Sequence, residues 1–166
     1  MKNYIITGNK NCVKSLNYND DCKVYNTYIE DEVNKHEMYT KFVIQNNGEI
    51  TKLIDCWDGF VRIWNFHSNK LLNKIAICPN CRVLDICMWK NDYLLIGGTN
   101  NVIKLVDLEN YKIVNDSLGY AKEPHCIKAI ISPQYGEYLA FIYGYGNIKV
   151  WKNKKIKKSY LAIEFI

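Results

Sequence analysis

The stretch VRIWNF, residues 61–66, lies at the centre of the segment CWDGFVRIWNFHSNKLL, residues 56–72, and variants of it recur along the chain. The related runs are VKSLNY at 13–18, IKLVDL at 103–108 and IKVW at 148–151. An aliphatic residue comes first in each run and a basic residue second, and the first three runs have Asn or Asp fifth. The spacing of roughly 45 residues is typical of repeated units that bury their apolar faces by stacking. Such architectures usually present surfaces for binding.

Short apolar runs separated by turn residues indicate β-structure. Residues 39–45, 52–56, 60–66 and 71–77 form four such runs, joined by hairpin-length turns rich in Asn, Gly and Asp. The runs are enriched in β-branched and aromatic residues, and none shows a sustained helical period. We therefore predict an all-β fold in which four-stranded antiparallel sheets follow one another, as in a radial propeller.

The same plan divides the chain into approximate repeats within a single domain. They are residues 1–30, 36–77, 81–118 and 124–166. The first repeat is incomplete, because no strand-like run precedes residues 4–7, and we expect three strands there and four in each of the others.

The net charge of +5 is a local feature of the chain. Six lysines lie in the segment 149–158, and charges elsewhere nearly balance. We interpret this segment as a solvated turn that blunts a strand edge, with attraction to RNA or anionic lipid as the alternative. A DNA partner is not expected, since only two arginines are available to read base edges.

Seven scattered cysteines fit a reducing, cytoplasmic compartment in which thiols pack as small apolar residues. The N-terminal sequence has no apolar signal region, and no run is long enough for a membrane helix. Cys78 and Cys81 have zinc-knuckle spacing, and His125 and Cys126 fall in the equivalent loop of the next repeat. Because no second pair of this type exists, we expect free thiols around a Pro-Asn turn, and no metal or cofactor.

Three segments resemble blades of the WD-repeat β-propeller family. They are CWDGFVRIWNFHSNKLL at 56–72, DYLLIGGTNNVIKLVDLENYKIV at 92–114 and ISPQYGEYLAFIYGYGNIKVW at 131–151. The runs are specific as a set, and the likeness covers nearly the whole chain, most weakly over residues 1–36. The resemblance implies about four blades of four antiparallel strands, forming a partial or half ring.

The resemblance also implies a buried network within a blade that joins a His, a Ser or Thr, an Asp and a Trp. His36, Asp58 and Trp64 match three of these roles in the second repeat, and His125 and Trp151 match two in the fourth. The hydroxyl position has no convincing match in any repeat. We therefore expect blade stability to rest mostly on apolar packing.

Members of this family usually close a ring of seven or eight blades, which is more than this chain supplies. An open half-ring would expose two apolar faces, which folded proteins avoid. Three arrangements stay open: a fragment of a larger propeller, two copies joined into an eight-bladed ring, and a half-ring capped by something else.

Trp57 precedes Asp58 at a position that in WD-repeat propellers commonly points to the face where partners bind. Tryptophan is enriched among binding hot spots, so we predict that Trp57 anchors a partner, with buried packing as the alternative. Further candidates lie near the starts of the first strands of each repeat: Met38, Thr40, Arg82, Leu84 and Lys128.

The sequence does not favour catalysis. Asp55, Asp58 and His36 have no nucleophile or paired carboxylate beside them, and no Gly pair precedes a helix that would hold phosphate. We predict a non-catalytic scaffold that binds a peptide or protein partner through its loops, with self-association as a possible way to complete the ring. The alternatives are a regulatory WD-repeat fragment of a larger kinase or ubiquitin-ligase-type protein, and an electrostatic binder of RNA or anionic lipid through residues 149–158.

Overall fold

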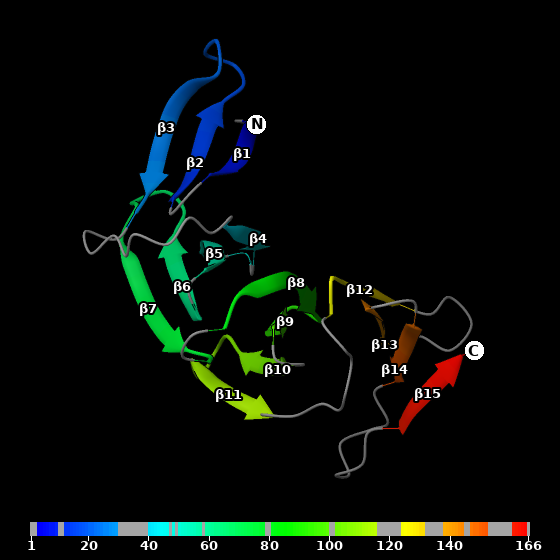
Figure 1. Ribbon diagram of the computed structural model, residues 1–166. Coiled ribbons are helices and arrows are strands. Elements are labelled where there is room, and N and C mark those ends of the chain that lie inside the picture. Colours follow the sequence, from blue (N-terminus) through cyan, green and yellow to red (C-terminus); the bar gives the residue numbers. More distant parts are fainter. Residues whose placement is uncertain are drawn as a thin grey trace. The chain divides into compact units, whose positions relative to one another are not determined.

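The computed structural model describes residues 3–9, 12–29, 40–46, 48, 50–57, 59–78, 81–99, 102–115, 124–131, 138–144, 147–152 and 161–165. Side chains are described for these residues up to 129, apart from 9, 102 and 115. The described residues form fifteen β-strands in four antiparallel sheets, which confirms the all-β prediction (Figure 1). The chain divides into two compact units, Met1–Asn80 and Cys81–Ile166.

The first unit contains two sheets, in which strands that are consecutive in the sequence are neighbours. The first sheet has the order β1 (Tyr4–Asn9), β2 (Cys12–Asn17) and β3 (Lys23–Tyr28). The second sheet has the order β4 (Lys41–Asn46), β5 (Thr51–Trp57), β6 (Phe60–Asn65) and β7 (Leu71–Ala76). Each sheet is therefore a meander of antiparallel hairpins, as the spacing of the turn residues predicts.

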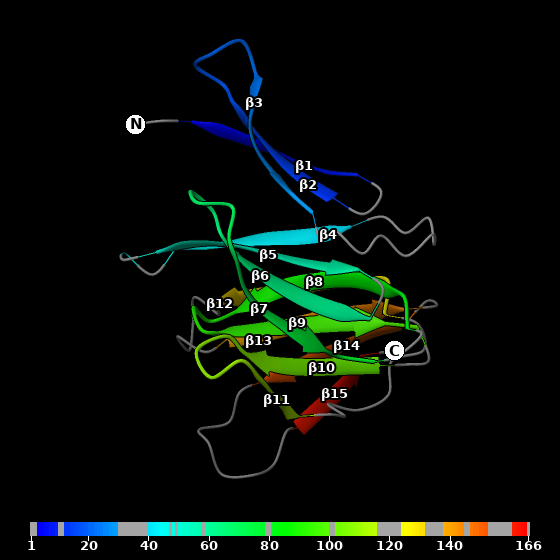
Figure 2. The same cartoon turned by 90° about the vertical axis from the view of Figure 1, so that its left-hand side faces the viewer.

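The second unit contains two further meanders. The third sheet has the order β8 (Val83–Trp89), β9 (Tyr93–Gly98), β10 (Val102–Asp107) and β11 (Lys112–Asn115). The fourth sheet has the order β12 (Cys126–Ile131), β13 (Tyr138–Gly144), β14 (Asn147–Lys152) and β15 (Leu161–Phe165). Figure 2 shows the strands of each sheet running side by side.

The recurring sequence run forms the same strand in every sheet: β2, β6, β10 and β14. Its first residue is fully buried in the three sheets with described side chains, as Val13, Val61 and Ile103. Its fifth residue closes the turn that follows. Oδ1 of Asn65 accepts hydrogen bonds from the backbone N–H groups two and three residues ahead, at 3.0 and 2.9 Å, and Asp107 does the same at 2.9 Å. Short polar side chains favour turns in this way, which explains why the fifth residue of the run is Asn or Asp.

An aromatic core joins the two sheets of the first unit. Val13 of β2 and Tyr28 of β3 are buried against Leu53, Trp64 and Phe66 of the second sheet. The ring of Tyr28 stacks on Phe66 with centroids 6.0 Å apart and meets Trp64 edge-on at 6.1 Å. Aromatic pairs at such distances add to the stabilisation that burial alone gives.

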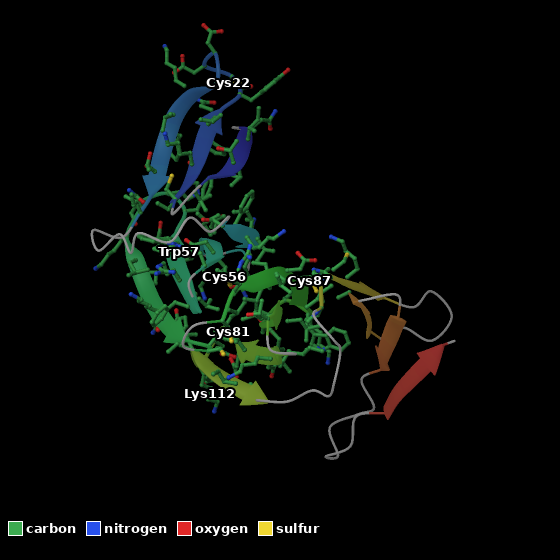
Figure 3. All side chains as sticks on the ribbon, viewed as in Figure 1. Cys22, Cys56, Trp57, Cys81, Cys87 and Lys112 are labelled. Carbon is green, nitrogen blue, oxygen red and sulfur yellow. The ribbon has the colours of Figure 1, made fainter. Side chains whose placement is uncertain are left out.

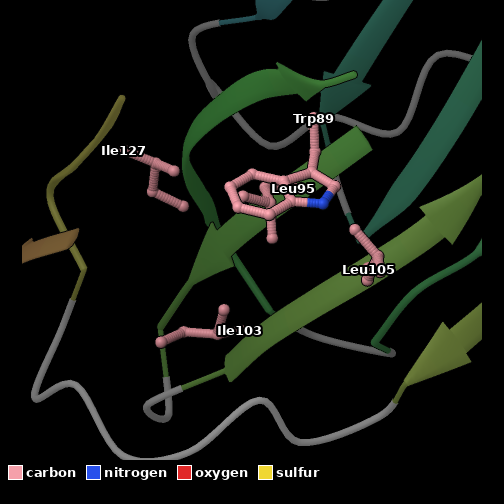
Figure 4. Packing of buried hydrophobic residues seen from close by; sticks show 5 residues of the cluster. All are labelled: Trp89, Leu95, Ile103, Leu105 and Ile127. Atoms are coloured by element: carbon pink, nitrogen blue, oxygen red, sulfur yellow. The ribbon is translucent and has the colours of Figure 1, made fainter. Parts of the chain in front are cut away.

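A second core joins the third and fourth sheets. Trp89, Leu95, Ile103 and Leu105 of the third sheet are buried with Ile127 of β12 (Figure 4). Each unit is thus held together by an apolar layer between two neighbouring sheets. Stacking of this kind is what a repeated four-stranded unit needs in order to bury its faces.

Candidate interaction surface

Trp57, which we predicted as an exposed anchor, is buried at the end of β5, with 4% of its surface exposed. The guanidinium carbon of Arg62 lies 3.9 Å from the centroid of the indole, and Arg62 Nη1 donates a 3.2 Å hydrogen bond to the Trp57 carbonyl oxygen. Trp57 pairs with Phe60 in the β5–β6 register, so Arg62 is on the same face of the sheet one position further along. The expectation of an exposed Trp57 is therefore wrong, because a buried arginine covers the ring by a cation–π contact. Figure 3 shows where Trp57 lies on the second sheet.

Asp55, which we did not assign to the buried network, accepts the hydrogen bond of Trp64. The indole Nε1–H of Trp64 donates to Asp55 Oδ2, and both side chains are buried. Asp55 is also the register partner of Arg62, so a carboxylate, a guanidinium and two indoles share one face of the second sheet. In the expected network the side chain of a Ser or Thr takes part, and no repeat has a convincing match for it. In the second sheet the Asp55 carboxylate is the acceptor for the Trp64 indole. The sequence signal for this face is that Asp55 and Trp57 are two positions apart in a strand, so that their side chains lie on the same face.

The other residues of the predicted network are not all described. His36 and Asp58 lie outside the described residues, and Trp151 is described only by its backbone in β14. His125 is exposed just before β12. Among the described residues of the second sheet, the hydrogen bond from Trp64 to Asp55 is the part of such a network that the structure places.

The five remaining contact candidates differ in exposure. Thr40 is buried, so it is not presented to a partner as predicted, because it directly precedes β4 where the first sheet approaches. Met38 lies outside the described residues. Arg82 and Lys128 are exposed, and Leu84 is partly exposed.

Leu84 lies in β8, Lys128 lies in β12, and Arg82 directly precedes β8. The strands β8 and β12 are in contact. Leu84 is the extra residue of a β-bulge, because Val83 pairs with Gly98 and Asp85 pairs with Gly97. Bulges redirect side chains away from the regular alternation of a strand. We call Arg82, Leu84 and Lys128 the β8–β12 surface.

A side chain of β8 ties the two strands together. Asp85 Oδ2 accepts a 2.8 Å hydrogen bond from the backbone N–H of Ile127. Gly97 allows the same approach, since a Cβ there would lie 2.8 Å from Ile127 Cδ1 and 2.9 Å from Pro124 Cγ. The β8–β12 surface is therefore supported by a fixed junction between the third and fourth sheets.

A cysteine lies next to this junction. Burial, together with the charge of Asp85, raises the pKa of the Cys87 thiol to about 12, while the charge of Lys128 acts in the opposite direction. Cys56, in the second sheet, is fully buried, and its pKa is well above the ordinary value, mainly because of burial. Both thiols are thus held in the neutral form, which makes them poor nucleophiles.

Cys78 and Cys81 are disulfide-bonded, while the other five cysteines are free. This corrects the prediction of two free thiols around the Pro-Asn turn. The physical reason is the spacing of the two residues, which brings their sulfur atoms within reach of each other. Sulfur atoms in a disulfide have no thiolate to offer a zinc ion.

Among the side chains that the structure describes, no group of three or more His, Cys, Asp or Glu is placed to hold a metal ion. No helix within the described ranges has the length and apolar character that a membrane crossing needs. Of the Lys-rich segment, residues 149–152 are described by backbone in β14, and the rest lies outside the described residues.

Antiparallel meanders of up to four strands, packed against a neighbouring sheet through an apolar layer, are typical of the blades of a WD40-type β-propeller. The structure is similar to the crystal structure of the WD40 β-propeller domain of Doa1, with a TM-score of 0.67 and 14% sequence identity. The match covers 97% of this chain and 51% of that chain. The chain thus has WD40 propeller blades as predicted, and it spans about half the length of that domain.

No protein-family model matches the sequence, and no curated protein matches it. The likeness to Doa1 at this identity shows the fold alone.

Proposed function

We propose that this chain is a non-catalytic scaffold whose β8–β12 surface binds a peptide or protein partner with an acidic segment. The WD40 propeller is generally a protein-interaction fold and is typically non-catalytic. The observations that carry the proposal are the contact between β8 and β12, the exposure of the cations Arg82 and Lys128, and the partial exposure of the apolar side chain of Leu84. An apolar contact with a polar rim is the usual anatomy of an interface.

The rigidity of this surface supports the proposal. The backbone N–H of Arg82 donates to Thr99 Oγ1 (3.0 Å) and the backbone N–H of Thr99 donates to the Arg82 carbonyl (2.9 Å), which fixes the residue before β8. The bond from Ile127 to Asp85 fixes β12 beside β8. A surface that is ordered before binding loses less conformational entropy when it binds.

The proposal is tested by cross-linking from defined positions. A photo-reactive amino acid at Arg82 or at Lys128 should capture a partner, whereas the same group at Lys112, exposed on β11 in the same unit, should not. The double variant Arg82→Ala, Lys128→Ala should recover at least fivefold less partner than the Lys112→Ala control. Equal recovery by both variants would refute the β8–β12 surface.

We also propose that the chain self-associates, so that a second copy covers the exposed face of the first sheet. Ile5 and Val24 on this face are 40% and 54% exposed, whereas Leu53, the residue of β5 equivalent to Ile5, is fully buried. A second copy that supplies a further blade would bury this face, and the chain spans half of a known WD40 domain. Sedimentation velocity at micromolar concentration should show a dimer, and a monomer over the whole concentration range would contradict it.

A further inference from the structure

The disulfide between Cys78 and Cys81 closes a very short loop, and the other five cysteines of the chain are free. Only three peptide bonds join the two residues, so their closeness follows from the chain itself. A disulfide stabilises a fold mainly by restricting the unfolded chain, and this effect grows with the length of the loop that the bond closes. A bond over four residues therefore contributes less to stability than one that joins distant strands.

Backbone hydrogen bonds hold the chain on both sides of the disulfide without involving either sulfur atom. Before it, the N–H groups of Ile77 and Cys78 donate to the Gly59 carbonyl oxygen at 2.8 and 3.2 Å. After it, the N–H of Thr99 donates to the Arg82 carbonyl oxygen at 2.9 Å, and the N–H of Arg82 donates to Thr99 Oγ1 at 3.0 Å. Because these bonds are the same in both redox states, we expect β7 and β8 to stay folded when the disulfide opens.

The two sulfur-bearing residues differ in exposure. Cys78 is partly exposed, whereas Cys81, labelled in Figure 3, has only 2% of its surface exposed. Thiol–disulfide exchange begins when a thiolate attacks one sulfur atom of the bond, and the other sulfur atom leaves. An incoming thiolate therefore reaches Cys78 Sγ more readily, which makes Cys81 Sγ the leaving group.

Two of the free thiols are poor competitors for this exchange. Burial raises the pKa of Cys56 well above its ordinary value, and burial together with Asp85 raises the pKa of Cys87 to about 12. Both are thus neutral at ordinary pH, and a neutral thiol attacks a disulfide slowly. The reductant must then come from outside the chain.

We propose that the Cys78–Cys81 disulfide is a redox-active site that exchanges with small thiol reductants of the glutathione type. The reductant's thiolate bonds to Cys78 Sγ, the S–S bond breaks, and its electron pair leaves with Cys81 Sγ, which takes up a proton from water. A second reductant thiolate attacks the reductant's sulfur in this mixed disulfide and releases Cys78, which is protonated in turn. Two reductant thiols are oxidised to one disulfide, and the protein gains two thiols.

A redox titration of the full chain tests the proposal. The chain is equilibrated without denaturant in buffers of reduced and oxidised glutathione, alkylated with iodoacetamide and digested with trypsin, which releases residues 75–82 with both cysteines. This peptide should pass from disulfide to doubly alkylated and return when oxidised glutathione is restored, while the circular dichroism of the chain stays unchanged. Reduction only after unfolding, free thiols at both positions in oxidising buffer, or loss of β-structure on reduction would each overturn the proposal.

Single variants identify the sulfur atom that is attacked. With oxidised glutathione, Cys78 in the variant Cys81→Ser should form a mixed disulfide at least about tenfold faster than Cys81 does in the variant Cys78→Ser. Cys22 is exposed in the unmodified chain and serves as the internal reference in both variants. Equal rates, or a faster reaction at Cys81, would overturn the assignment of Cys78. Both experiments contain no partner protein, so their outcome is separate from that of the β8–β12 surface.

Discussion

The hydroxyl of Tyr28 in β3 donates a 2.6 Å hydrogen bond to the backbone carbonyl oxygen of Phe66, the residue after β6. Asn26 Nδ2 donates to the same oxygen at 2.8 Å. Ser15 Oγ lies 3.3 Å from the Tyr28 hydroxyl, so a polar chain crosses the aromatic core. Two sheets of the first unit are thus joined by directed bonds as well as by apolar packing. Buried bonds of this type fix one arrangement of neighbouring elements.

Tyr28→Phe should lower the free energy of unfolding by about 1–2 kcal/mol. The ring stays in the core, and two interactions of the hydroxyl are lost: the bond to the Phe66 carbonyl, which keeps Asn26 as a donor, and the contact with Ser15 Oγ. Urea unfolding followed by tryptophan fluorescence measures the change. Tyr18→Phe is the matched control, because Tyr18 is exposed, and it should change stability by less than about 0.5 kcal/mol. Equal effects of the two variants would show that the Tyr28 hydroxyl contributes nothing.

Trp57→Ala should destabilise the fold rather than weaken partner binding alone. The indole is buried beneath Arg62, and its removal leaves a cavity together with a buried guanidinium that has lost its ring. The expected loss is about 3–5 kcal/mol, as for other buried aromatic residues. Trp57→Phe, which keeps a ring beside Arg62, should lose less. Wild-type stability in Trp57→Ala, measured by urea unfolding, would contradict the packing.

Gly97→Ala should lower the free energy of unfolding by about 1–3 kcal/mol, as overpacked cores do. The new methyl group would meet Ile127 Cδ1 at 2.8 Å. Adding Ile127→Val removes that atom, so the double variant should lose less stability than the two single changes added together. Gly8→Ala has no such rescue by a side-chain change at Thr40, because its nearest contact is the Thr40 backbone oxygen. Strictly additive effects of Gly97→Ala and Ile127→Val would refute the contact.

The sequence was sufficient for the strands because their signals are local. The run at 61–66 combines an alternation that defines a strand with an Asn that closes its turn, and β6 occupies Phe60–Asn65. The same combination places β2 and β10 correctly. Local geometry of this kind depends on residues a few positions apart, which a single sequence displays in full.

The side-chain contacts of the candidate site could not be predicted, because they join residues on neighbouring strands. Trp57 and Arg62 are on one face of the second sheet only once the β5–β6 register is fixed. The bond between Asp55 and Trp64 cannot be assigned from the sequence, because the two residues are nine positions apart on neighbouring strands. Exposure is likewise decided by neighbouring elements, so the burial of Thr40 and Trp57 became certain only with the packing of the first and second sheets.

Asp107→Asn should lower stability at neutral pH by about 1 kcal/mol and remove part of the acid dependence of unfolding. Burial alone would raise the pKa of Asp107, but hydrogen bonds from Asn110 and Glu109 outweigh it and hold the pKa below its ordinary value of 3.8. A lowered pKa contributes stability that is present above pH 3.8 and is lost as the pH falls through the folded value. Urea unfolding between pH 2 and 6 should therefore show the two proteins converging at the acid end. A constant difference over this range would contradict the assignment.

Cys87→Ala should make unfolding less dependent on alkaline pH. The ordinary thiol pKa is 9.0, and in the folded chain burial raises the pKa of Cys87 to about 12, with Asp85 adding to the rise and Lys128 opposing it. A raised pKa contributes stability that is fully present below pH 9 and is lost as the pH rises towards 12, because the unfolded chain ionises first. The unfolding free energy of the wild type should therefore fall more steeply between pH 8 and pH 11 than that of Cys87→Ala.

Iodoacetamide kinetics give an independent measure of the same property. At pH 9 about half of an unperturbed thiol is ionised, whereas only about one thousandth of Cys87 is, so its alkylation in the folded chain should be slower by two orders of magnitude or more. Cys22 is exposed, and it serves as the internal reference in the same digest. The rate at Cys87 should rise tenfold per pH unit up to about pH 11. Alkylation of Cys87 as fast as that of Cys22 at pH 8 would show that the thiol is neither shielded nor held neutral beside β12.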